Sequence, residues 1–149
     1  MKSETMSSTY YAKIIAADGV FFKGQIRSLI IPEIDGEKEI LAHHEDMVIA
    51  VYDGELRFQE SEGAEWRKAV IGRGFLEIAN NRVTLLVESA ERPEDIDIAR
   101  AKAAKERAEE QMRQKQSVQE YYHSSASLAR AMARLKVASG GKHGINFSE

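Results

Sequence analysis

Acidic and arginine side chains recur at helical spacing in the second half of the sequence. Asp97, Arg100 and Arg107 would share one face of a helix, because residues three or four apart lie on the same side. Arg130 and Arg134 stand four residues apart on a second predicted helix. If the two helices fold back on each other, the arginines converge near an acid, which suits a polyphosphate carrying a ribose or a base amine. The alternative is a solvated surface with one Asp97–Arg100 ion pair.

No other group of reactive or metal-binding side chains indicates a catalytic or metal site. In His43-His44-Glu45, neighbouring side chains on a strand would point to opposite faces, so the three would not share one ion, and a loop or interface role is favoured. The segment Gly72-Arg73-Gly74 lacks the lysine of a phosphate loop and predicts a hairpin turn. Trp66 is expected to be a core or edge aromatic. No Ser/His/acid arrangement or pair of carboxylates stands out.

Composition limits the class of protein. The chain has 149 residues, of which 43% are hydrophobic and 30% charged, which is typical of one globular domain or two small ones. It has no cysteine, which excludes disulfides, thiol nucleophiles and cysteine-bound metals. The net charge of −3 argues against a nucleic-acid partner. No apolar run approaches the roughly 20 residues of a membrane span, and the N-terminus lacks the apolar region of a signal peptide, so we expect neither membrane insertion nor export.

The two halves of the chain differ in net charge and in amino-acid composition. Residues 1–91 carry ten basic and sixteen acidic side chains, and residues 92–149 carry eleven and eight. Most aromatic and β-branched residues lie in the first half, whereas alanine is concentrated in the second. We therefore expect two structural units, residues 1–91 and residues 92–149.

The first half is typical of many short strands. Turn signals separate the apolar runs, among them Asp18-Gly19, Asp53-Gly54 and Asn80-Asn81. Regularly spaced short strands without an intervening helix predict an antiparallel sandwich or barrel. The expected strands are Tyr11–Ile15, Val20–Lys23, Ile26–Ile31, Met47–Tyr52, Leu56–Phe58, Trp66–Ile71, Phe75–Ile78 and Val83–Val87.

The second half predicts helices. Pro93 followed by two acids is a good helix start, and residues 96–116 contain no Gly or Pro. A second stretch runs from about Val118 to Ala138. Its expected apolar stripe comprises Tyr121, Leu128, Ala131, Met132, Leu135 and Ala138. Ser117 and Glu120 fit a capping box that would start a new helix, but no Gly or Pro separates the stretches, so the sequence permits both a hairpin and one long helix. Such a segment could be a switch between two packings.

The order and spacing of several short motifs resemble one family. They are Gly36-Glu37, Ile40-Leu41, His44, Asp53-Gly54-Glu55-Leu56, Gly74-Phe75-Leu76-Glu77-Ile78, Val83-Thr84-Leu85-Leu86, Ala90-Glu91 and Ile96-Asp97-Ile98-Ala99-Arg100-Ala101. On these residues the chain resembles the epsilon subunit of bacterial F-type ATP synthases, from about Tyr11 to Ala138. The resemblance implies an α+β fold in two parts, an N-terminal antiparallel β-sandwich followed by a C-terminal two-helix hairpin that can also extend.

The resemblance implies a non-catalytic rotor subunit on the cytoplasmic face of the bacterial cell membrane. In the family, the sandwich binds the gamma subunit of the central stalk and rests on the c-ring, coupling ion flow to ATP synthesis. The extended helices reach the catalytic alpha/beta hexamer and restrain ATP hydrolysis. Asp35, Gly36, Glu37 and His44 fall at the implied gamma and c-ring interface. The loop around His44 lacks the family's usual prolines and glycines, which makes it less rigid by composition.

Some members of the family bind ATP on the folded hairpin through a motif of the type Ile/Leu-Asp-x-x-Arg-Ala. Residues 96–101 fit that motif at every fixed position. The implied ATP contacts are Glu91, Ile96, Asp97, Arg100, Ala101, Arg107, Arg130 and Arg134. ATP is then expected as a regulatory ligand, and no cofactor is required. The competing interpretations are a free-standing ATP sensor and a purely structural adaptor. The segments before Tyr10 and after Ser139 are expected to be mobile ends.

Overall fold

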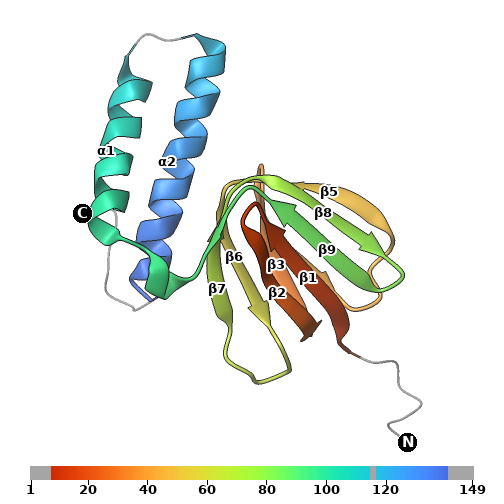
Figure 1. The fold of residues 1–149 in the computed structure, drawn as a ribbon. Helices are drawn as coiled ribbons and strands as arrows, with labels where there is room; N and C mark the ends of the chain where they lie inside the picture. The colour runs from red at the N-terminus through yellow and green to blue at the C-terminus, as the bar shows by residue number, and fades with distance from the viewer. Residues whose placement is uncertain (1–7, 115–116, 141–149) are drawn as a thin grey trace, which may run out of the picture.

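A computed structural model describes residues 8–114 and 117–140 of the chain. It shows a β-sandwich beside a pair of antiparallel helices (Figure 1). This confirms the two-part α+β architecture and the hairpin alternative for the helices. The expected mobile ends lie almost entirely outside the described residues.

Two five-stranded sheets form the sandwich. The first has the order β2 (Gly19–Ile26), β1 (Tyr10–Ala16), β9 (Arg82–Val87), β8 (Gly74–Ala79) and β5 (Met47–Val51). The second has the order β10 (Ala90–Glu91), β7 (Arg67–Ile71), β6 (Gly54–Gln59), β3 (Ser28–Glu33) and β4 (Gly36–Leu41). Asn80 and Asn81, both at positive φ, make the tight turn between β8 and β9, as the turn signal predicted.

Two features of the sheets differ from the sequence-based expectation. The pair β1 and β9 is parallel, whereas every other pair is antiparallel among the described residues. Alternation of apolar residues encodes which face is buried but not the direction of the neighbouring strand. The strands β4 and β10 were not expected at all. The longer of the two is β4. It is an edge strand in which only Ile40 is buried, and charged side chains are typical of such edges.

The core lies between the sheets. It is formed by alternate residues along the strands, which face inward. They include Ile14, Leu29, Leu56 and Leu76, all of which are almost fully buried. The Tyr10 hydroxyl donates a 2.5 Å hydrogen bond to the carbonyl oxygen of Ile40. Burial raises the pKa of Tyr10, so this group stays a neutral donor that joins the two sheets.

The helical part follows directly after β10. A short 3-10 helix η2 (Pro93–Asp95) precedes α1 (Ile98–Arg113), and α2 (Val118–Ala138) returns beside it. The first α-helix therefore begins later than Pro93, because Asp97 caps it by accepting a hydrogen bond from the Arg100 amide.

The capping box at the start of α2 is confirmed. The Ser117 hydroxyl accepts from the Glu120 amide, and the Glu120 carboxylate accepts from the Ser117 amide. Because these bonds satisfy the free amides of a new helix start, they stabilise the break that produces the hairpin.

The helix α2 has two contact faces rather than the single stripe expected from its sequence. Its buried residues are Ser124, Ala131, Ala133 and Val137. Of the expected stripe, Tyr121 and Met132 are exposed. Ala131 of the stripe is buried as expected. The expectation was wrong for Tyr121 and Met132, because α2 packs both on α1 and on strands β6 and β7 of the sandwich.

Candidate functional site

A cavity of about 300 Å³ lies where the helical hairpin meets the end of the sandwich. It is lined by Glu91, Asp95, Asp97, Arg100, Ala101, Ala104, Arg107 and Arg134. Six of the eight residues expected to contact ATP therefore line one cavity. Ile96 and Arg130 do not.

The first turns of α1 build one wall of the cavity. Asp97 is the N-cap, and its carboxylate oxygen lies 3.1 Å from the Arg100 amide nitrogen. Arg100, Ala104 and Arg107 follow at spacings of four and three, which keeps them on one face of the helix. Ala101 is buried, and its small side chain lets α2 pack closely.

An ion pair between α2 and β10 closes the opposite wall. The Nε of Arg134 lies 2.5 Å from the Glu91 carboxylate, and both side chains are partly buried. The cavity therefore exists in this form only while α2 is folded back, since Glu91 belongs to the sandwich and Arg134 to the second helix.

The two remaining expected residues have other contacts. Arg130 donates to Asp53 at 2.7 Å and to Ser127 at 3.2 Å, so its guanidinium is bonded to the sandwich. Ile96 packs against Val70 and the α2 residues that cover it. Ile96 thus contributes an apolar anchor next to the cavity.

The arrangement is suited to binding a ligand that carries phosphate groups. Three guanidinium groups and three carboxylates line the cavity. Guanidinium groups bind phosphate oxygens in bidentate fashion, and carboxylates accept hydrogen bonds from ribose hydroxyls or a base amine. The lining holds no Ser, Thr, Cys or His that could act as a nucleophile with its base.

The residues expected at the gamma and c-ring interface fall into two groups. Asp35 forms the turn before β4, where Gly36 and Glu37 begin the strand, and Glu37 pairs with Arg57 at 3.0 Å. His44 lies in the loop after β4, and its Nδ1 is 2.9 Å from the Glu45 carbonyl oxygen. The two groups therefore lie at opposite ends of an edge strand.

The loop after β4 also contains His43 and His44, whose side chains are of a type that can bind a metal ion. His43 and His44 lie in a turn and the loop after it, not on a strand. Within the described parts of the chain, no three His, Cys, Asp or Glu residues are grouped so that they could hold a metal ion.

Neither α1 nor α2 could span a membrane, and the same holds for every other helix in residues 8–114 and 117–140.

Sequence reasoning missed an apolar row across the outer face of the first sheet. Paired positions place Ala50, Phe75, Leu86, Ile15 and Val20 side by side across all five strands. Phe75 is 62% exposed, and Leu86 and Val20 are about half exposed. A shallow hollow of about 650 Å³ lies over this row. The signal was present in the sequence, since a strand with one solvated face should alternate with polar residues, whereas residues 47–52 are all apolar or aromatic.

The chain matches two family models that together span its described part. Residues 9–93 match the model described as ATP synthase, Delta/Epsilon chain, beta-sandwich domain. Residues 94–139 match ATP synthase, Delta/Epsilon chain, long alpha-helix domain.

Curated relatives are similar over most of their length. The ATP synthase epsilon chain of Ruminiclostridium cellulolyticum is 44% identical over 128 residues, which cover 86% of this chain and 94% of the relative. That of Caldanaerobacter subterraneus is 40% identical over 135 residues, covering 90% and 96%.

Solved structures share the fold at low identity. A chain of the Euglena gracilis mitochondrial ATP synthase superposes with a TM-score of 0.75 at 22% identity, covering 91% of this chain and 84% of that one. A chain of the Tetrahymena thermophila enzyme, from its central stalk and c-ring, gives 0.63 at 8% identity, covering 90% and 99%. On the family models and the curated relatives, the chain belongs to the ATP synthase delta/epsilon chain family, the epsilon subunits of the F-type central stalk.

Proposed function

We propose that this chain is a non-catalytic rotor subunit that also regulates ATP hydrolysis. Its sandwich binds the gamma subunit and contacts the c-ring. Its helices restrain ATP hydrolysis when they extend towards the catalytic hexamer. The observation that carries the regulatory part is the arginine-lined cavity, because residues of the sandwich and of both helices must come together to form it.

The apolar row on the first sheet supports gamma binding. Exposed apolar residues aligned across five strands are unfavourable in water and favour a partner that covers them. The second sheet carries the hairpin at its β6 and β7 strands, so the outer face of the first sheet stays available for gamma while the helices are folded.

The two ends of β4 are the proposed contact with the c-ring. Asp35, Gly36 and Glu37 would touch the ring at one end and His44 at the other, in a contact that runs along the edge of the sandwich. The chain is then a peripheral component at the cytoplasmic face of the bacterial membrane, held there by its partners.

ATP is the ligand that we propose for the cavity. Arg100, Arg107 and Arg134 would bind its phosphates, and Glu91 and Asp97 would accept from the ribose or the base amine. Arg130 would join them only by leaving Asp53, to which its guanidinium is bonded in this structure.

ATP bound only to the folded hairpin would shift the balance between the folded and extended states. At ten times its Kd, a ligand stabilises the state that it binds by about 1.4 kcal/mol, which is roughly a tenfold change in the ratio of the two states. High ATP would therefore withdraw the inhibitor, and low ATP would release it.

Titration of the isolated protein with ATP by calorimetry tests the site. Arg100→Ala should weaken ATP binding about tenfold or more, because hydrogen bonds between charged groups contribute about 1.5–3 kcal/mol. The matched control is Arg113→Ala, since Arg113 lies on the same helix but pairs with Glu110 away from the cavity. Equal affinity in the two variants, or no binding by the unmodified chain, would refute the assignment.

A further inference from the structure

Two buried carboxylates lie on the sandwich beneath the second helix. Asp53 precedes β6, and Glu55 lies within it. Their side chains are only 3% and 6% exposed, although they belong to the type of residue that is most often solvated. Neither lines the arginine-rich cavity, so the proposed nucleotide site leaves both carboxylates without a role.

Asp53 holds one cation from each part of the molecule. Its Oδ2 accepts from the Nη1 of Arg130 on α2 at 2.7 Å. Its Oδ1 accepts from the Nε of Arg73, in the loop before β8, at 3.1 Å.

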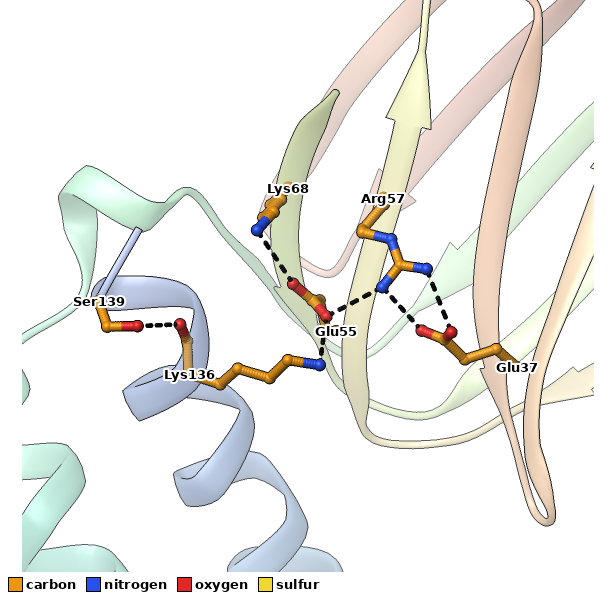
Figure 2. A network of polar contacts seen from close by, with 6 residues as sticks. All are labelled: Glu37, Glu55, Arg57, Lys68, Lys136 and Ser139. Atoms are coloured by element: carbon orange, nitrogen blue, oxygen red, sulfur yellow. Dashed lines mark hydrogen bonds and ion pairs between the residues drawn. The ribbon is translucent and has the colours of Figure 1, made fainter. Parts of the chain in front are cut away.

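Glu55 also holds cations from both parts of the molecule (Figure 2). Its partner on α2 is Lys136, which lies about one and a half helical turns after Arg130. The Nζ of Lys136 lies 2.9 Å from its Oε1. From the sandwich, Arg57 approaches the same oxygen at 3.3 Å, and Lys68 lies 3.9 Å from Oε2. Figure 2 shows Glu55 between the helix on one side and the strands on the other.

Little apolar surface joins the helix to the sandwich. The cluster at this contact consists of Val70, Ala133 and Val137, with Ile96 packed against it, and it is separate from the main core. Arg130, Ala133 and Lys136 are spaced three residues apart, so charged contacts flank the apolar one on the same face of α2. Two charged contacts and one apolar cluster therefore hold α2 on the sandwich.

We propose that Asp53 and Glu55 form an electrostatic latch that holds α2 on the sandwich and releases it without leaving a buried charge unpaired. When α2 departs, Asp53 keeps Arg73, and Glu55 keeps Arg57 and Lys68. A buried charge that loses its sole partner is strongly unfavourable. The second set of cations removes that penalty, so the latch can open and close reversibly. The latch rests on the folded–extended equilibrium proposed above, and its Glu55–Lys136 contact involves none of the residues assigned to the nucleotide.

Release of the latch also separates Arg130 and Lys136 on the helix from their carboxylate partners. Both are then free to pair with an acidic surface of another subunit. The docked state of the isolated chain relies on ion pairs whose cations are partly exposed. It should therefore weaken as ionic strength rises.

Fluorescence energy transfer within the full chain tests the latch. The chain has no cysteine, so Glu62→Cys and Gln119→Cys provide two dye sites, one in the β6–β7 loop and one at the far end of α2. Without nucleotide, Asp53→Asn and Glu55→Gln should each lower the ratio of docked to undocked molecules about threefold to tenfold. The variant that carries both changes should lose most of the salt dependence.

The control is Glu110→Gln, which breaks an ion pair of 2.7 Å within α1 that does not join the two parts. An unchanged ratio and salt dependence in the double variant, or an equal shift in the control, would overturn the proposal. If Asp53→Asn unfolds the sandwich, as Trp66 fluorescence would report, Arg130→Gln and Lys136→Gln provide the same test from the helix side. The latch predicts that each lowers the docked ratio, and no change in either would refute it.

Discussion

Replacement of Phe75 by Ser should weaken binding of the gamma subunit and leave the fold intact. Phe75 of β8 lies between Ala50 of β5 and Leu86 of β9 in the apolar row and is 62% exposed. An aromatic side chain buries about 200 Å² when fully covered, so about 120 Å² remains for a partner to cover. At about 25 cal/mol per Å² this corresponds to about 2–3 kcal/mol, or a 30- to 150-fold increase in Kd.

The assay is titration of a catalytic hexamer–gamma complex with the isolated chain. Ile34→Ser is the matched control, because Ile34 is 71% exposed but lies in the turn between β3 and β4, on the other sheet. This turn is the proposed contact with the c-ring, which the assay complex does not contain. We expect the control to bind gamma as the unmodified chain does. Equal Kd values for Phe75→Ser and the unmodified chain would show that gamma does not cover this face, and equal losses in both variants would show a nonspecific effect.

Three further predictions concern stability and the hairpin. Leu76→Ala should lower the free energy of unfolding by about 2–5 kcal/mol, measured by denaturant titration, because Leu76 is fully buried between the sheets. Ser117→Ala should cost about 1 kcal/mol at the start of α2, because the Glu120 amide loses its bond to the Ser117 hydroxyl, and hydrogen exchange of residues 118–121 in the isolated chain should become faster. Hydrogen bonds from the Ser117 amide, and then from its hydroxyl, lower the pKa of the Glu120 carboxyl. The capping contribution is therefore present above about pH 4 and is lost as the pH falls further, as the Ser117 amide signal in an NMR titration should show, with no such transition in Glu120→Ala.

Each of these has an outcome that would contradict it. Unfolding of Leu76→Ala at the denaturant concentration of the unmodified chain would place that side chain outside the core. Unchanged exchange in Ser117→Ala would mean that the cap does not define the break between the helices. A Ser117 signal that is independent of pH would show that the Glu120 carboxylate does not bond to it.

The sandwich was predictable in outline because its signals are local. Asp-Gly and Asn-Asn turns separate runs of β-forming residues, and eight of the ten strands follow from them. The strand β4 escaped because Glu37, Lys38 and Glu39 make it polar, which is how an edge strand avoids pairing. The parallel pairing of β1 with β9 joins segments about 70 residues apart, and no local pattern encodes it.

The cavity was predictable in composition but not in every contact. Helical spacing predicted that Arg100, Arg107 and Arg134 would converge, and the family resemblance added Glu91, which the fold brings to the same cavity. The pairing of Arg130 with Asp53 was not foreseen, because it joins residues 77 positions apart. The sequence marks Asp53 as part of a turn and of a family motif, and neither indicates that its buried carboxylate bonds to the second helix.

The most direct test of the account is the rate of ATP hydrolysis by the catalytic hexamer–gamma complex, with and without this protein, across a range of ATP concentrations. We expect the protein to slow hydrolysis at low ATP and to lose this effect at high ATP. Reversal of Arg130 and Arg134 to Glu should relieve the inhibition, because the extended helix would no longer meet an acidic surface. Unchanged hydrolysis at every ATP concentration, despite confirmed binding to gamma, would contradict the regulatory role and leave a structural adaptor.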